Sequence, residues 1–245
     1  MIRLLLIGVI VQFFSTGCSR HYTKQKEIFS HVSLKENVPQ PLSNDSIYRF
    51  RQKVEKETGR VIAVTEGALT KDGAESTLGN FVCDALKQAA GKIYPAEKID
   101  VVIINRGGLR MSIAAGEIKV GTIFELMPFE NEMVLIKMSG ECLLKFGNLV
   151  IDQKHPFFGL KVKIKDKQVS MTMNDGTSID KEKFYTVESS DYLARGSDNF
   201  LFLKEGAIAN SGLKIRDAII RYCEKTTEEG KQIKPYTDGR IEISK

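Results

Sequence analysis

The fold class predicted from the sequence is α+β, with helices mixed among mainly antiparallel strands. Segments with helical spacing of apolar residues alternate with short runs rich in β-branched residues. Tight turns at Asp166–Gln168 and Asn174–Gly176 indicate that some of these strands pair as neighbours. The composition, with 42% hydrophobic and 27% charged residues, is that of a globular domain rather than a disordered chain or a membrane bundle.

The first residues have the features of an export signal. Arg3 supplies a positive charge, Leu4–Phe14 is an apolar segment, and the small residues Ser15–Gly17 precede Cys18. This arrangement resembles a bacterial lipobox, which predicts a lipoprotein signal peptide at 1–17 and lipidation of Cys18. A plain secretory signal or a transmembrane anchor is the alternative, but the apolar run is short for a bilayer. We therefore expect a lipid-anchored protein of the bacterial cell envelope, on the periplasmic or outer-membrane surface.

Residues 18–46 are predicted to form the lipidated N-terminus and a flexible tether. The segment is polar, contains Pro39 and Pro41, and has no apolar period of either kind. The remaining residues, 47–245, are long enough to form one domain with a full core.

In the first half of this domain, each element is predicted from its local pattern. Ser76 is a suitable N-cap and Gly91 a suitable end for a helix with one apolar face. Another helix is expected to end before Pro128. The predicted helices are 47–57, 76–90 and 120–127, and the predicted strands are 60–65, 98–105 and 133–138.

In the second half, Ser139 is predicted to cap a helix that continues to Ile151. Two short strands flank the Asp166–Gln168 turn, and a later strand leads into a loop at 191–200. The predicted strands are 160–164, 169–173, 184–190 and 239–243, and the last predicted helix is 212–224.

The most informative stretch begins with Ile99–Asn105, which is almost entirely aliphatic and β-branched, as expected for a strand buried on both faces. Asn105, the Gly107–Gly108 pair and Arg110 lie at or just beyond its end. Open sheets commonly bind ligands at the carboxyl ends of their strands, and paired glycines allow a close backbone approach. A ligand site is therefore predicted at this turn.

The order of these motifs resembles the C-terminal domain of the 5'-nucleotidase and UDP-sugar hydrolase family, over roughly residues 60 to 243. The resemblance implies a layered α/β/β/α domain that binds a nucleotide. The motifs that carry it are Glu75-Ser76-x-x-Gly79-Asn80, Asn105-x-Gly107-Gly108-Leu109-Arg110, Gly116-x-Ile118, Pro128-Phe129-x-Asn131, Ser139-Gly140 and Tyr192-Leu193-Ala194-x-Gly196-x-Asp198-x-Phe200.

The resemblance also assigns roles to individual residues. Phe129 and Tyr192 align with two aromatic positions that sandwich the base in relatives, and each such stack contributes about 1 to 3 kcal/mol. Arg110 can donate two hydrogen bonds to a phosphate or to ribose oxygens. The implied substrate-binding residues are Asn105, Gly107, Gly108, Arg110, Phe129, Asn131, Tyr192 and Asp198.

Each role has a structural alternative. The two rings could be core packing, Arg110 could hold a carboxylate, and Asp198, which suits a pair of ribose hydroxyls, could form an Asx turn. Asn105, whose amide suits a base edge or a sugar hydroxyl, could instead cap the turn. The sequence also departs from the family: Tyr192 replaces an expected Phe, and Arg106 and Ser197 each replace a Gly. The basic residue expected before Glu75 has no clear counterpart; Lys71 is near, but we do not assign it that role.

No catalytic residue and no metal ligand is predicted in this chain. Relatives hydrolyse phosphate esters with two metal ions in an N-terminal metallophosphoesterase domain, whose His- and Asp-rich motifs do not occur here. The chain has only three histidines. We therefore expect no cofactor in this chain and divalent metals only in a partner, so the chain would not be catalytic alone.

Three hypotheses follow. The leading one is a membrane-anchored, nucleotide-binding half of a split 5'-nucleotidase, which acts with a separately encoded metallophosphoesterase subunit. The second is a non-catalytic surface lipoprotein that binds nucleosides or nucleotides, and the third is a scaffold whose site has decayed. The formal charge of +5 is compatible with an anionic ligand but is too scattered to indicate nucleic acid.

Overall fold

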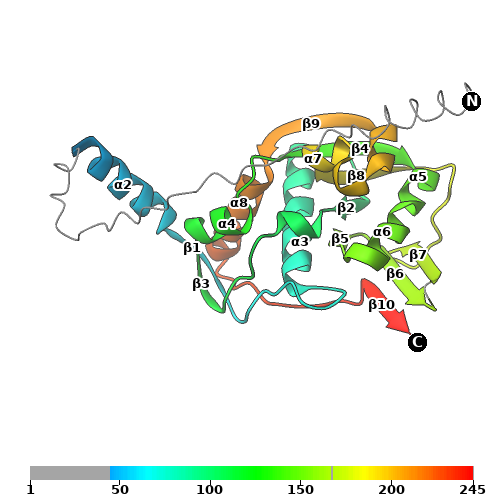
Figure 1. Ribbon diagram of the computed structural model, residues 1–245, viewed down its shortest axis with the longest axis horizontal. Coiled ribbons are helices and arrows are strands. Elements are labelled where there is room, and N and C mark those ends of the chain that lie inside the picture. Colours follow the sequence, from blue (N-terminus) through cyan, green and yellow to red (C-terminus); the bar gives the residue numbers. More distant parts are fainter. Residues whose placement is uncertain (1–44, 167, 245) are drawn as a thin grey trace, which may run out of the picture. The chain divides into compact units, whose positions relative to one another are not determined.

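The computed structural model describes residues 45–166 and 168–244 (Figure 1). The predicted signal at 1–17, the lipidation site Cys18 and the tether up to residue 44 lie outside the described residues. The first described element is the helix α2 (Asp45–Thr58), which begins two residues before the predicted start of the domain. Among the described helices, none is long and apolar enough to cross a membrane.

A five-stranded mixed sheet lies at the centre of the fold, in the order β5-β2-β8-β4-β9. β2 and β8 are parallel, and the other neighbours are antiparallel. The central strands consist mainly of aliphatic side chains, because both faces of the sheet are covered. The strands are β2 (Val101–Ile103), β4 (Glu132–Ser139), β5 (Phe157–Phe158), β8 (Phe184–Ser190) and β9 (Ala207–Lys214).

One face of the sheet packs against two long helices, α3 (Thr77–Ile93) and α8 (Ile215–Glu228), which lie beside each other (Figure 1). Val102, Ile104 and Met133 contribute the strand side of this core. A two-stranded antiparallel sheet and a short helix extend the same layer: β1 (Val61–Thr65), β3 (Gly116–Lys119) and α4 (Val120–Leu126).

The opposite face of the central sheet carries a second core, which includes Val101, Ile103 and Val187. Phe146 packs edge-on against Phe157 in this core, with ring centroids 5.6 Å apart. A three-stranded sheet of order β10-β6-β7 and two short helices close this side: α5 (Gly140–Leu144), α6 (Phe146–Gln153), β6 (Leu160–Lys165), β7 (Gln168–Met173) and β10 (Ile241–Ser244). The predicted α+β class is confirmed.

Several predicted boundaries were wrong. The strand expected at 98–105 is only Val101–Ile103, because the Asp100 carboxylate binds the Thr186 N–H and the Ile104 N–H turns to the carbonyl of Pro156. The helix expected to stop before Gly91 continues to Ile93. A glycine ends a helix only where the backbone adopts a left-handed turn, and Gly91 has no positive φ.

The helix expected from Ser139 to Ile151 is two helices that meet at Lys145. The Lys145 N–H bonds to the carbonyl of Cys142, three residues back, and this tighter turn separates α5 from α6. Ser139 does cap α5, because its hydroxyl accepts the N–H of Cys142.

The sequence analysis does not predict the edge strand β9, and the predicted start of the last helix at 212 is wrong because residues 212–214 belong to this strand. The segment has no clear apolar alternation, and its strand conformation depends on pairing with β4, for example Leu135 with Ala209. Gly212 has a φ of +69°, and α8 begins only at Ile215. The short strands β3 and β5 were also missed.

Candidate functional site

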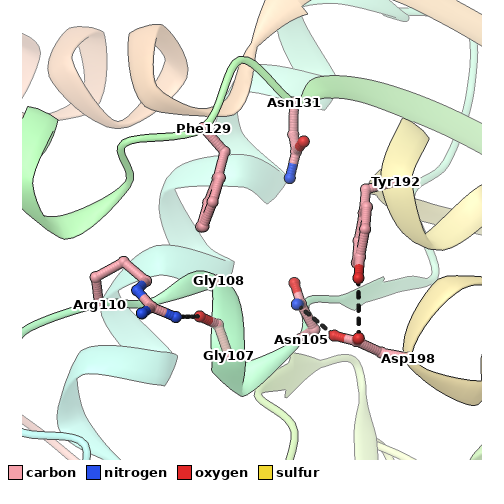
Figure 2. A pocket seen from close by; sticks show the side chains of 8 residues that line it. All are labelled: Asn105, Gly107, Gly108, Arg110, Phe129, Asn131, Tyr192 and Asp198. Atoms are coloured by element: carbon pink, nitrogen blue, oxygen red, sulfur yellow. Dashed lines mark hydrogen bonds between the residues drawn. The ribbon is translucent and has the colours of Figure 1, made fainter. Parts of the chain in front are cut away.

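One cavity of about 260 Å³ lies where loops from several elements converge at the end of β2. The eight residues predicted to bind a ligand all line it, and they are drawn in Figure 2: Asn105, Gly107, Gly108, Arg110, Phe129, Asn131, Tyr192 and Asp198. The structure therefore brings together residues that are separated by as many as 93 positions in the sequence.

The floor of the cavity is the turn after β2. Asn105 precedes a short 3₁₀ helix, η1 (Arg106–Gly108), and is only 7% exposed. A Cβ atom on Gly108 would lie 2.8 Å from the Asn105 side-chain oxygen, so no larger residue fits there without displacing that amide. The Asn105 amide donates a 2.7 Å hydrogen bond to the Asp198 carboxylate.

One wall is formed by Arg110 and Phe129. The Arg110 N–H bonds to the carbonyl of Leu126 at 2.8 Å, which joins the turn to the end of α4. Its guanidinium donates to the Gly107 carbonyl at 3.2 Å and lies 6.0 Å from the centroid of the Phe129 ring. Both side chains are exposed, and both line the cavity (Figure 2).

The loop that carries Phe129 and Asn131 is held from behind by α8. The Ile215 N–H bonds to the Asn131 carbonyl, and buried Arg216 donates to Glu130 at 2.6 Å while stacking 4.1 Å from the Phe124 ring. Hydrogen bonds from Lys214 and Arg216 lower the pKa of Glu130 to about 2. These contacts fix the backbone on both sides of Phe129.

The opposite wall is Tyr192, in the one-turn helix α7 (Asp191–Ala194). Ser190 caps this helix, and the Asp191 carboxylate accepts the Glu132 N–H at 3.0 Å. The Phe129 and Tyr192 rings project from opposite sides, with the opening of the cavity between them (Figure 2). They are 41% and 38% exposed, so neither ring is part of the core.

Asp198 joins the floor to this second wall. Its carboxylate accepts from the Asn105 amide and from the Tyr192 hydroxyl, the latter at 3.0 Å, and this bond raises the pKa of Tyr192. Asp198 lies in η2 (Ser197–Asn199) with a φ of +52°, which is unusual for a residue other than glycine. A further 3₁₀ helix, η3 (Leu201–Glu205), anchors the end of this loop.

His155 supports the site from below, and sequence reasoning missed it. Its ring is 2% exposed, its Nδ1 accepts the Arg106 N–H at 3.1 Å, and it packs 4.9 Å from the Phe200 ring. Burial lowers its pKa to about 4, so the ring is neutral at pH 7. The only available signal was a lone His before Pro156, and the sequence does not reveal its neighbours.

The cationic side chains of Lys71, Arg106 and Arg110 lie near one another around the glycine turn. The Arg106 guanidinium bonds to the carbonyls of Lys71 at 2.5 Å and Gly73 at 3.3 Å, so it neither lines the cavity nor crowds it. The Lys71 ammonium donates to the Leu109 carbonyl, and its pKa is lowered by burial and by the nearby Arg106 and Arg110. Among the described residues, no carboxylate pairs with any of the three.

The cavity thus presents two aromatic faces, one guanidinium, two amides and one carboxylate. Aromatic faces suit a planar ring system, the carboxylate suits hydroxyl donors, and the cationic side suits an anion. Within residues 45–166 and 168–244, no group of three or more His, Cys, Asp or Glu side chains is placed to hold a metal ion.

Comparison with protein families identifies a match to a known family. The model described as "5'-nucleotidase, C-terminal domain" matches residues 58–205, which include all eight residues of the cavity.

Curated relatives and solved structures match over most of this chain but only part of their own length. A cell wall protein of Listeria monocytogenes is 27% identical over 69% of this chain and 24% of its own length. A 5'-nucleotidase of Vibrio vulnificus is 22% identical over 83% of this chain and 37% of its own length. The crystal structure of a 5'-nucleotidase precursor from Thermus thermophilus aligns with a TM-score of 0.68 and 25% identity, over 81% of this chain and 42% of that one.

Proposed function

Because this chain belongs to the family of 5'-nucleotidase C-terminal domains, we propose that its cavity binds a nucleotide for hydrolysis by a partner. In this proposal the chain is the substrate-recognition half of a split 5'-nucleotidase, and a separately encoded metallophosphoesterase subunit carries the divalent metals and the attacking water. The observation that carries the proposal is the convergence of two facing aromatic rings, one arginine and one aspartate on a single cavity.

The aromatic walls support a nucleobase as the central part of the ligand. Phe129 and Tyr192 are both partly exposed and project from opposite sides of the opening (Figure 2). A base inserted between them would stack on both rings, and such stacking tolerates any base. The cavity of about 260 Å³ is slightly smaller than typical pockets for drug-sized ligands, which begin at about 300 Å³, and this size suits a single nucleoside unit.

The cations support an anionic group attached to that nucleoside. Arg110 lies beside Phe129, and Lys71 and Arg106 lie behind the same turn without a carboxylate partner among the described residues. Burial lowers the pKa of Lys71, and the charges of Arg106 and Arg110 lower it further because like charges repel one another. A phosphate near Arg110 would relieve that repulsion and accept two hydrogen bonds from its guanidinium.

The place of action in this proposal is the bacterial cell envelope. Lipidation of Cys18 would anchor the domain to a membrane, and the relative from Listeria monocytogenes is itself called a cell wall protein. The proposed partner would meet the bound nucleotide outside the cytoplasm.

The proposal is tested by titrating the full chain with AMP and adenosine in a calorimeter, alongside a phosphate-release assay with added Mn²⁺. We expect binding without phosphate release. Phe129→Ala should weaken binding of both ligands by about tenfold, because it removes one stack of about 1 to 3 kcal/mol.

Phe184→Ala is the matched control. Phe184 is 61% exposed and does not line the cavity, so its removal should leave both affinities unchanged. Absence of binding to either ligand, or equal effects of the two variants, would contradict the proposed site. Release of phosphate by the chain alone would contradict the need for a metal-bearing partner.

A further inference from the structure

Both carboxylate oxygens of Asp198 accept hydrogen bonds from other side chains of the cavity. One carboxylate oxygen accepts from the Asn105 amide at 2.7 Å and the other from the Tyr192 hydroxyl at 3.0 Å. Asn105 and Tyr192 both line the cavity, so both hydrogen bonds lie on the side from which a ligand would approach (Figure 2). Each carboxylate oxygen of Asp198 therefore already accepts one hydrogen bond before any ligand enters.

This arrangement reduces the binding free energy that a sugar hydroxyl of the ligand can contribute. If one Asp198 oxygen faced the cavity without a donor, a ligand lacking the matching hydroxyl would leave a desolvated carboxylate oxygen unpaired. Sites built in that way reject such analogues strongly, because the penalty falls on the site's own buried polar group. Here the Tyr192 hydroxyl supplies the donor instead of the ligand.

The same hydroxyl also competes with the ligand. A vicinal diol can donate one hydrogen bond to each oxygen of a carboxylate, but at one of these oxygens the Tyr192 hydroxyl already donates. Each carboxylate oxygen can accept more than one hydrogen bond, but a second donor on the same oxygen must share it with the first or displace it, so the ligand hydroxyl adds little net free energy. The competing donor is the hydroxyl of Tyr192. A phenylalanine at this position would keep the aromatic ring but would have no hydroxyl to donate.

We propose that the Tyr192 hydroxyl determines sugar specificity, so that the cavity accepts ribose and 2'-deoxyribose ligands about equally well. The inference rests on the proposed nucleotide site and names its substrate class as both ribonucleotides and deoxyribonucleotides. Tyr192 acts through Asp198. When the ligand lacks a sugar hydroxyl, the Tyr192 hydroxyl still donates a hydrogen bond to the carboxylate. When the sugar hydroxyl is present, the same bond reduces the binding free energy that this hydroxyl contributes.

Asp198 is held in place independently of Tyr192. Its left-handed backbone follows Gly196, whose φ is +86°, and its other oxygen remains bonded to the Asn105 amide. Removing the Tyr192 hydroxyl should therefore expose one carboxylate oxygen to the ligand without releasing the carboxylate from the cavity floor.

The test is calorimetric titration of the full chain and of Tyr192→Phe with adenosine and 2'-deoxyadenosine. In the wild type we expect the two dissociation constants to agree within about threefold, because the ligand hydroxyl makes little net difference. In Tyr192→Phe, adenosine should bind more tightly and 2'-deoxyadenosine less tightly, so that their ratio rises to about tenfold or more, as hydrogen bonds to charged groups allow. Asp198→Asn combined with Tyr192→Phe should remove most of this discrimination, because the charged acceptor is lost.

Tyr48→Phe is the matched control. Tyr48 lies in α2 and does not line the cavity, so deletion of its hydroxyl should leave the ratio unchanged. A wild type that prefers adenosine tenfold or more, with the same preference in Tyr192→Phe, would overturn the specificity role while leaving the nucleotide site intact. If neither protein binds either nucleoside, the proposed function itself fails, and the specificity role fails with it.

Discussion

At the scale of single residues, Glu188 is unusual because its carboxyl group is fully buried without a hydrogen-bond partner in the described part of the chain. It lies in β8 with 0% exposure, and neither of its carboxylate oxygens has a hydrogen-bond partner among the described residues. Burial raises its pKa well above the usual range, so the folded chain favours the protonated form. A buried carboxyl group of this kind makes stability depend on pH.

We predict that Glu188→Gln abolishes this pH dependence. Because the folded chain binds the Glu188 proton more tightly than the unfolded chain does, the contribution is fully present below the unfolded pKa and is lost as pH rises towards the folded pKa. The free energy of unfolding of the wild type, relative to the variant, should fall by up to about 1.4 kcal/mol per pH unit as the pH rises above about 4.3 towards the folded pKa of Glu188.

Chemical denaturation of both proteins at a series of pH values measures this difference. Exposed Glu117 in β3 provides the control, because Glu117→Gln should leave the pH dependence of the wild type unchanged. A constant difference between wild type and Glu188→Gln across the series would show that the carboxyl group titrates alike in both states.

At the scale of elements, the cavity is built from loops that start at the ends of β2, α4 and β8. His155 connects two of these loops, because it accepts the Arg106 N–H of η1 and packs against Phe200 beyond η2. Its pKa, lowered to about 4, means that the folded chain binds fewer protons than the unfolded chain between about pH 6.5 and 4. Acid in this range therefore favours unfolding.

We predict that His155→Leu and His155→Asn separate the role of His155 as a hydrogen-bond acceptor from its role as a titratable group. Leucine leaves the Arg106 N–H without an acceptor, which should cost about 1 to 3 kcal/mol of stability and weaken nucleotide binding. Asparagine offers a carbonyl oxygen near the position of Nδ1 and does not titrate, so it should retain most of the binding.

The acid dependence should disappear in both variants. Relative to either one, the wild type should lose up to about 3 kcal/mol of stability between pH 6.5 and 4. Thermal or chemical unfolding at several pH values, together with AMP titration at pH 7, measures both effects. Equal AMP affinities for the wild type and His155→Leu would show that His155 does not position the turn.

At the scale of the whole molecule, charge is distributed unevenly relative to the cavity. The formal net charge is only +5, yet Lys71, Arg106 and Arg110 gather at one turn. We predict that AMP binds more tightly than adenosine at low salt and that this advantage shrinks as the ionic strength rises from about 0.01 to 1 M, where the Debye length falls from about 30 to 3 Å.

Titrations with AMP and adenosine across this range of ionic strength measure the ratio of their dissociation constants, which is the advantage of AMP. Arg110→Gln should reduce it at low salt, whereas Arg221→Gln, in α8 and away from the cavity, should not. An advantage of AMP that is independent of salt and of Arg110 would exclude this turn as the phosphate site.

Local sequence determined which segments form the site. The order of motifs, through its resemblance to a known family, assigned the eight residues that line the cavity, and the mixture of helical and β-rich patterns predicted the α+β class. The aliphatic run before Asn105 and the Gly107–Gly108 pair predicted a buried strand and a ligand-binding turn after it. These features are readable because buried strands need apolar side chains and tight turns need glycine, whatever lies around them.

Only the tertiary structure decided how those residues are paired. The edge strand β9 exists because β4 offers it hydrogen-bonding partners, and Arg106 turns away from the cavity because the carbonyls of Lys71 and Gly73 lie beside it. The bond between Asn105 and Asp198, and the support that His155 gives the turn, likewise join residues from separate segments of the chain. Such contacts depend on distances in space, which local propensity and spacing do not encode.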